Sequence, residues 1–565
     1  MTSTCPTPQK VSRTSAAPGR LPPAPPARVS LPRPALWLLP ALLVAVAGFE
    51  RRWMSDDAFI YVRTVRQVLA GNGPVFNIGE RVESSTGTLW QWLLVAAGLS
   101  GADLATAAVY GGLLLTAAGF ALAGLGALRL YGTSRAVPLG SLVLLGLPPV
   151  WDFATSGLET GLSTCWIAGA WLALTARPAS LWTSALLGLG PLVRPDLGLV
   201  SLVFLGAQWL LARPSPRGLL AGAAAAGALP ALYEIFRAGY FGHLLPLPAV
   251  AKEASHSLWH RGLVYLVDFT HPYLLALPAL LVLTALLPRP PRPAAGFVPV
   301  LAPVLAGLLC WGYVIRVGGD FMHGRMLLPG LLLMLLPVFV VPATRVRALA
   351  AAGVAAWAAV CAVALRVPYP GHVGPAGIAD ERGVYVRLNA DAHPVHHTFA
   401  GAPYSRAYAR GVRDAARAKE PVLLLGRYAR TTAKSPSLTA SYLVLGLNGS
   451  AVPLDGVALD PVGLAYPVAA HSQRLAPGRA GHDKRLPAAW FLADHGDGRH
   501  LPPGTDRGAV AAARHALSCG ALAELRHATR DPLTPARFLA NLTGAWDRTT
   551  FRFPADPRRA ERELC

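Results

Sequence analysis

The sequence predicts a polytopic α-helical membrane protein with a C-terminal α/β domain outside the cytoplasm. Three observations support this prediction. Only 14% of the residues are charged and 53% are hydrophobic, and the mean hydropathy is +0.41, a balance beyond that of ordinary soluble domains. Apolar runs that suit membrane spans recur as far as residue 366 but not after it. Basic residues collect on one side of these runs and acidic residues on the other.

Residues 1–34 precede the first apolar run and are rich in Pro, Ser, Thr and Ala, and their charged side chains are all basic. Such a composition buries too little apolar surface to fold, so we expect a disordered cytoplasmic tail. The alternative is a long signal peptide, because residues 45–47 (Ala-Val-Ala) resemble a cleavage site. Both interpretations leave the acidic residues that follow outside the cytoplasm.

A transmembrane domain is expected over residues 35–366. Its first span is residues 35–49, whereas residues 90–99 are only about half as long as a bilayer requires and are interpreted as re-entrant or interfacial. The remaining expected spans are residues 104–128, 136–150, 161–176, 181–193, 197–212, 218–235, 263–287, 296–315, 326–343 and 348–366. Together these runs predict about eleven spans.

The placement of charge sets the orientation of the spans. With the N-terminus in the cytoplasm, the inner segments carry Lys and Arg but no Asp or Glu, a stronger bias than the positive-inside rule requires. Odd span parity then places residues 367–565 outside a plasma membrane that the chain crosses many times. The net charge of +21 could suggest a nucleic-acid-binding protein. The separation of the charges across the expected spans argues against that function.

The outer domain, residues 367–565, is richer in charged residues and glycine. Short strand-like runs at 421–426 and 441–445 alternate with helical patterns such as residues 510–525. An α/β domain large enough for its own core is therefore expected. Cys519 and Cys565 are its only cysteines, so we expect a disulfide between them in an oxidising compartment.

The chain is organised around residues 50–90, an expected outer catalytic loop. Asp56 and Asp57 open an amphipathic helix with Arg63, Arg66 and Gln67 on its polar side. A carboxylate can accept the proton of an attacking hydroxyl as general base. Since neighbours on a helix point about 100° apart, one aspartate should face the site. The other should cap the helix or orient a basic partner such as Arg325.

Asp56 is slightly preferred as the base because it opens the acidic pair at the membrane rim. The alternative is that Asp56 and Asp57 only stabilise the N-terminus of their helix and perform no chemistry.

Four further polar clusters stand at span ends on the side of the acidic pair: residues 155–160, 193–196, 246–253 and 317–325. Ionisable groups at membrane depth are costly and usually mark a functional path. Arginine binds phosphate through two parallel hydrogen bonds, which suits a lipid-phosphate leaving group. The candidates for binding the phosphate and sugar of a lipid-linked donor are Glu159, Arg194, Asp196, Lys252, Asp320, His323 and Arg325.

Simpler interpretations remain open for several of these residues. Arg194 and Asp196 also suit a salt-bridged loop, and His323 also suits a hydrogen-bonded loop histidine. Asp320 and His323 are suitable ligands for a divalent cation, but two groups are too few to predict one. No cofactor is therefore assigned.

An acceptor glycan is expected to bind the outer domain at His482, Asp483 and Lys484, with Trp490 nearby for stacking. The reason is that lipid-phosphate groups belong at the membrane rim, whereas a long polymer needs an exposed surface. The alternative is a surface loop beside a core tryptophan.

Residues 55–90, together with the SGLETG, RPD and GGDFMHGRMLLP runs, resemble the terminal β-arabinofuranosyltransferases of mycobacteria and corynebacteria. These are membrane glycosyltransferases of the GT-C type. The segments DPVGLAYP, PGRAGHDK and the chain end from Cys519 to Cys565 extend the resemblance to nearly everything after residue 35. Tyr466 and Asp483 depart from the family pattern, in which Asp and Glu are expected.

The resemblance implies a GT-C-like fold and places the family's paired acidic residues at Asp56 and Asp57. It implies decaprenylphosphoryl-arabinose as the donor. The acceptor would be the arabinan of arabinogalactan or lipoarabinomannan, extended by a terminal β-(1→2) linkage.

Other functions fit the sequence less well. A transporter would show charges between its spans and an inverted repeat, and neither is evident. A motility-associated membrane protein, a label that related sequences have carried, would need no acidic pair or phosphate-binding arginine. A transferase for another sugar such as mannose stays open. The Ala, Arg, Gly and Pro content suggests a high-GC actinobacterium, which need not make arabinogalactan.

Overall fold

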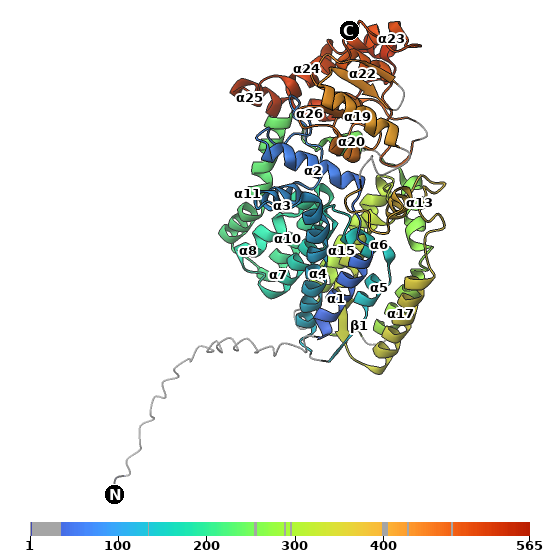
Figure 1. The fold of residues 1–565 in the computed structure, drawn as a ribbon. Helices are drawn as coiled ribbons and strands as arrows, with labels where there is room; N and C mark the ends of the chain where they lie inside the picture. The colour runs from blue at the N-terminus through green and yellow to red at the C-terminus, as the bar shows by residue number, and fades with distance from the viewer. Residues whose placement is uncertain are drawn as a thin grey trace.

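The computed structural model describes Thr2 and residues 35–565, except residues 134, 254–256, 288–289, 294–295, 398–404, 427–428 and 476–477. The tail expected over residues 1–34 lies, apart from Thr2, outside the described residues. The chain forms a helical lower part with a smaller outer domain above it (Figure 1).

The lower part contains five helical segments, within the described chain, that are long and apolar enough to cross a bilayer. These are α4 (Leu104–Tyr131), the joined η1 (Pro195–Leu197) and α10 (Gly198–Ala212), α11 (Pro216–Phe241), α15 (Val298–Arg316) and α17 (Arg345–Val363). The expected membrane part is therefore present as long apolar helices.

Shorter helices account for most of the other apolar runs. They are α1 (Ala35–Glu50), α3 (Thr88–Leu99), α7 (Thr160–Ala176), α8 (Leu181–Gly188), α9 (Gly190–Val193), η2 (Arg325–Leu327), α16 (Leu328–Leu335) and η3 (Leu336–Val338). The number of membrane crossings stays a prediction. By length and composition, only the five longer segments can each cross a bilayer.

Two expected spans are interrupted. Residues 136–150 form β1 (Ala136–Pro138), α5 (Gly140–Leu145) and α6 (Pro148–Ala154) instead of one helix. Gly146 and Pro148 break the run, because glycine weakens a helix interior and proline suits a helix start. β1 pairs antiparallel with β2 (Val340–Pro342), which ends the apolar run at residues 326–343.

The second interrupted span, residues 263–287, forms α13 (Trp259–Thr270) and α14 (Ala276–Leu286). Leu274 between them has a φ of 50°, which lies in the left-handed region and ends a right-handed helix. A smooth apolar composition hides this break from the sequence.

The outer domain contains a four-stranded sheet in the order β4-β3-β5-β6. The strands are β3 (Val422–Leu425), β4 (Ala429–Thr432), β5 (Thr439–Ser441) and β6 (Val457–Leu459). β3, β5 and β6 run parallel, and β4 pairs antiparallel with β3. This mixture of sheet and helix agrees with the expected α/β domain.

The sheet is buried on both faces, as parallel strands usually are. On β3, Val422 and Leu424 join the large core that continues into the lower part, whereas Leu423 joins a second core with Trp490 and Phe491. The second core is closed by α22 (Ala488–His495), α23 (Arg507–Ala516), α24 (Gly520–Arg530) and α27 (Pro557–Leu564). The shared large core joins the outer domain to the membrane part.

Helix α2 (Asp56–Leu69) lies between the membrane helices and the outer domain (Figure 1). Arg63 and Gln67, expected on a polar face, are both buried under the outer domain. The Arg63 guanidinium donates hydrogen bonds to the backbone carbonyls of Phe76, Gly449, Val452, Pro453 and Gly456. The outer domain therefore covers the part of the polar side of α2 that carries Arg63 and Gln67, whereas Arg66 is exposed.

The structure joins Cys519 to Cys565 in a disulfide, with the two Cα atoms 5.3 Å apart. Cys519 is the N-cap residue of α24 and Cys565 follows α27. The bridge therefore fixes the chain end to α24 and closes a loop with a sequence separation of 46.

Replacing both cysteines by serine should destabilise the outer domain by up to about 4 kcal/mol, because the unfolded loop regains chain entropy. Thermal unfolding of the purified protein measures the loss, with Cys165→Ser in α7 as the control for a half-buried free thiol. Recovery of both peptides as free thiols after alkylation of native protein would contradict the assignment.

Candidate active site

Two adjoining cavities lie where α2 meets the ends of the membrane helices next to the outer domain. They share the lining residues Thr86, Glu159, Pro248, Lys252 and Arg325. The first, about 50 Å³, contains Asp57. The second, about 130 Å³, contains Arg194, Asp196 and Asp320. Six of the predicted donor residues and one of the two aspartates therefore meet in one place.

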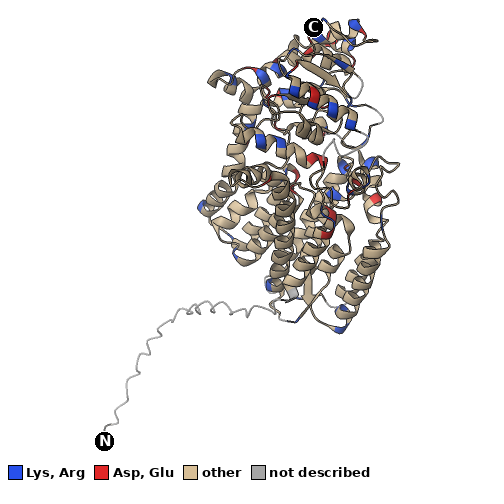
Figure 2. Cartoon of the chain, in the orientation of Figure 1, with Lys and Arg blue, Asp and Glu red and all other residues tan. Residues whose placement is uncertain are grey.

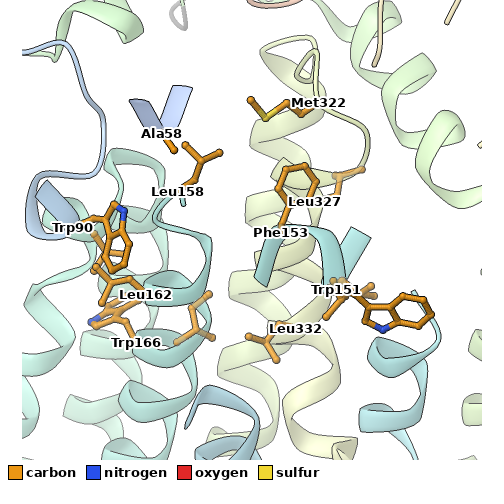
Figure 3. Packing of buried hydrophobic residues seen from close by; sticks show 14 of the residues in the cluster. Ala58, Trp90, Trp151, Phe153, Leu158, Leu162, Trp166, Met322, Leu327 and Leu332 are labelled. Carbon is orange, nitrogen blue, oxygen red and sulfur yellow. The ribbon is translucent and has the colours of Figure 1, made fainter. Parts of the chain in front are cut away.

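Apolar residues of several segments pack together in the core beside the site. Figure 3 shows Ala58 of α2 above Leu158, and Phe153 of α6 beside Leu327. Gly157 has a φ of 77°, and a Cβ there would lie 2.8 Å from the Cβ of Ala58. A glycine is thus required for the turn at residues 155–160 to approach α2 so closely.

The two aspartates have different environments. The Asp56 carboxylate accepts hydrogen bonds from the backbone N–H groups of Leu447, at 2.7 Å, and Gly446, at 3.2 Å. These groups begin α20 (Leu445–Ala451). Asp57 lines the cavity instead. The predicted division of tasks fits this geometry, but the slight preference for Asp56 as the base does not.

Burial changes the proton affinity of both carboxyl groups, because a charged carboxylate is poorly solvated there. Burial and the neighbouring Asp57 charge raise the pKa of Asp56 to about 7, against the two backbone N–H donors. Burial also raises the pKa of Asp57, while Lys252 and Arg325 oppose the rise. Asp57 is therefore more basic than an exposed aspartate.

Arg325 and Lys252 hold the carboxylate of Asp320 at the cavity wall. Arg325 Nη2 lies 2.7 Å and Lys252 Nζ lies 3.9 Å from the Asp320 oxygens. Burial acts to raise the pKa of Asp320, but Arg325, Lys252, the Phe321 backbone N–H and Arg194 together hold the pKa below its usual value. Asp320 therefore stays ionised and fixes both basic groups beside Asp57.

Arg194 forms a two-pronged ion pair with Asp196, at 3.0 Å from Nε and 2.9 Å from Nη2. Its third nitrogen, Nη1, is buried without a hydrogen-bond partner among the described residues. Glu159 lies 3.9 Å from Arg194 and accepts a hydrogen bond from Tyr61. Arg194 therefore forms the salt-bridged loop that the simpler interpretation expects. It also keeps one N–H group, on Nη1, that can donate a hydrogen bond to an anion.

His323 lies away from this site. Its Nδ1 is 2.7 Å from Asp268, and its Nε2 is 3.0 Å from the Tyr273 hydroxyl. It lines a separate cavity together with Arg51 and Glu381. His323 therefore fits the simpler interpretation, that of a hydrogen-bonded loop histidine. It does not fit a metal site shared with Asp320, because the two residues line different cavities.

The residues expected to bind the acceptor are largely buried contacts between domains. Asp483 forms an ion pair with Arg261 at 2.7 Å, and Lys484 pairs with Glu253 at 3.0 Å. His482 packs edge-on against Phe321. Trp490 is completely buried in the second core, so it offers no stacking surface. Trp490 therefore fits the alternative interpretation, in which it is a core tryptophan beside a loop.

Several cavity residues were not predicted from the sequence. Tyr61 donates to Glu159, and its hydroxyl also accepts a hydrogen bond from the Gly87 backbone N–H. Thr86 lines both cavities. The hydroxyl run at residues 84–86 was a usable signal. Arg261, which holds Asp483, had none, because its partner lies more than 200 residues away.

Lys484→Met should destabilise the protein by about 3 kcal/mol, because it leaves the buried Glu253 carboxylate without its nearest cation. Thermal unfolding measures the effect, and Lys419→Met, at an exposed lysine, is the matched control. Unchanged stability together with a higher KM for acceptor would instead restore Lys484 as an acceptor ligand.

Comparisons with known proteins identify relatives of this chain. A model of the AftB family C-terminal domain matches residues 417–563. A terminal β-(1→2)-arabinofuranosyltransferase of Mycobacterium tuberculosis is 35% identical over 93% of this chain and 96% of its own length. One of Corynebacterium glutamicum is 35% identical over 88% and 82%. No solved structure matches.

The matched region includes the membrane part and the outer domain, so the resemblance read from the motifs is confirmed over most of the chain. This chain belongs to the family of the terminal β-(1→2)-arabinofuranosyltransferases.

Proposed function

We propose that this chain transfers an arabinofuranosyl group from decaprenylphosphoryl-arabinose to the end of an arabinan, forming a terminal β-(1→2) linkage. The acceptor is the arabinan of arabinogalactan or lipoarabinomannan. The observation that carries the proposal is the cavity in which Asp57 faces Lys252 and Arg325, at the outer ends of the membrane helices. Membership of the family supports the sugar and the linkage.

Asp57 is the general base of this reaction. Its carboxylate accepts the proton of the acceptor hydroxyl while that oxygen bonds to the anomeric carbon of the donor. The bond between the anomeric carbon and the phosphate oxygen breaks, and the bonding electrons leave with the lipid phosphate. The position of Asp57 at the cavity supports this task, and burial, which raises its pKa, makes it a stronger base than an exposed aspartate.

Lys252, Arg325 and Arg194 bind the phosphate and neutralise the charge that it gains as leaving group. Asp320 and Asp196 hold these cations in place. Glu159 and its partner Tyr61 orient the sugar hydroxyls. Preorganised charge of this kind needs no rearrangement at the moment of transfer, and it acts strongly because Arg194, Arg325 and Asp320 are buried.

The membrane part has a GT-C-like arrangement with about eleven spans, the N-terminus in the cytoplasm and residues 367–565 outside it. The support comes from charge. Lys and Arg mark the lower ends of the helices in Figure 2, whereas Asp and Glu gather at their upper ends and in the outer domain. This orientation gives the site access to a lipid-linked donor in the outer leaflet of the plasma membrane.

The proposed donor is tested by incubating purified protein with radiolabelled decaprenyl-phosphate carriers of arabinose, mannose or glucose and a synthetic arabinan acceptor. Transfer should occur only from the arabinose carrier, and linkage analysis should find a terminal β-(1→2)-arabinofuranose. Preferred transfer of mannose would favour the related enzyme for another sugar. Absence of transfer from every carrier would contradict the function.

Asp57→Asn should lower kcat by on the order of a hundredfold or more, because asparagine keeps the size of the side chain but cannot accept the proton. Asp56→Asn is the matched control at the adjacent residue. It should lower the free energy of unfolding, because an amide accepts hydrogen bonds from both backbone N–H groups less well than a carboxylate does. Its kcat should fall much less than that of Asp57→Asn. The reverse order of kcat values would assign the base to Asp56.

A further inference from the structure

A cavity of about 840 Å³ lies in the outer domain, several times larger than either cavity of the candidate active site. Its wall includes Leu425 at the end of β3 and Ser441 at the end of β5. Pro461, two residues after β6, also lines it. The cavity therefore opens at the carboxyl ends of three parallel strands, the edge where open α/β sheets bind their ligands.

The lining of this outer-domain cavity is mostly apolar with a few polar groups. Tyr442, Leu443 and Phe491 supply aromatic and aliphatic surface, and Ser441 and Arg485 supply the polar side chains. None of its lining residues, among those the structure describes, is acidic, so the cavity has no charge complement for a cation. A neutral sugar chain fits such a lining, because its C–H faces pack on apolar side chains while a few donors orient its hydroxyls.

One short turn connects this cavity to the catalytic site. Pro461 lines the outer-domain cavity, and Leu464 lines the cavity that contains Asp57. The Asp460 carboxylate fixes the turn by accepting hydrogen bonds from four successive N–H groups, those of residues 462–465. Three residues span at most about 11 Å, so the two cavities lie within reach of a short oligosaccharide.

We propose that the outer-domain cavity binds the acceptor arabinan a few sugars behind the terminal residue that reaches Asp57. This proposal rests on the proposed function and adds the place where the polymer is held. It replaces the acceptor site expected at residues 482–484, whose charged side chains are engaged in ion pairs between domains.

A lipid chain is a poorer occupant than a glycan. The cavity belongs to the sheet and to α22, and Figure 1 shows α22 above α2, on the side away from the membrane helices. A lipid tail bound there would have to leave the bilayer, whereas a cell-wall polymer approaches from that side.

The test uses Arg485→Ala, which removes the basic side chain, and Leu443→Trp, which fills the cavity from an exposed position. Each variant is assayed with a short arabinose disaccharide and with a long linear arabinan oligosaccharide. In the parent protein the long acceptor should have the lower KM. In both variants the KM for the long acceptor, divided by the KM for the short one, should rise about tenfold, a change of about 1.4 kcal/mol in binding. The kcat for the long acceptor should be retained.

Arg413→Ala, at an exposed arginine of α19 (Arg406–Ala418) outside the cavity lining, is the matched control and should leave the ratio unchanged. The proposal is overturned if the parent protein has equal KM values for both acceptors, or if neither variant changes their ratio. In both outcomes arabinose transfer itself continues, so they are distinguishable from failure of the proposed function, in which no acceptor is elongated.

Discussion

The position of α2 between two domains is the constraint on which the site depends. Membrane helices support one side of α2, and the outer domain covers the other through the buried Arg63 and its five carbonyl partners. A buried guanidinium is tolerated only when its donors are satisfied. Because those carbonyls come largely from residues 449–456, α2 reaches its final setting only when the outer domain has folded against it.

This arrangement separates the tasks of two adjacent carboxylates. The outer domain engages Asp56 through the N–H groups of Leu447 and Gly446, which leaves Asp57 directed to the cavity. The cations of the cavity are in turn held by their own carboxylates, Arg325 by Asp320 and Arg194 by Asp196. The buried charges are therefore paired in advance, and an incoming phosphate meets a site that needs little reorganisation.

The sequence predicted those features that depend on local pattern. Long apolar runs predicted the helices α4, α11, α15 and α17. The resemblance of the motifs predicted the family. Features that depend on distant partners were not predictable. The burial of Arg63 depends on carbonyls almost 390 residues away, and so does the choice between Asp56 and Asp57. His323 is three residues from Asp320, yet Asp268 holds it in another cavity, which sequence proximity could not indicate.

The central claim is that Asp57 and the basic groups around it receive the lipid phosphate and its sugar. A structure of the protein with a non-transferable polyprenyl-phosphate arabinose analogue tests it most directly. The phosphate should lie within hydrogen-bond distance of Lys252 or Arg325, with the anomeric carbon facing Asp57. A phosphate bound instead in the cavity lined by Arg51, Arg366 and Arg382 would contradict the account.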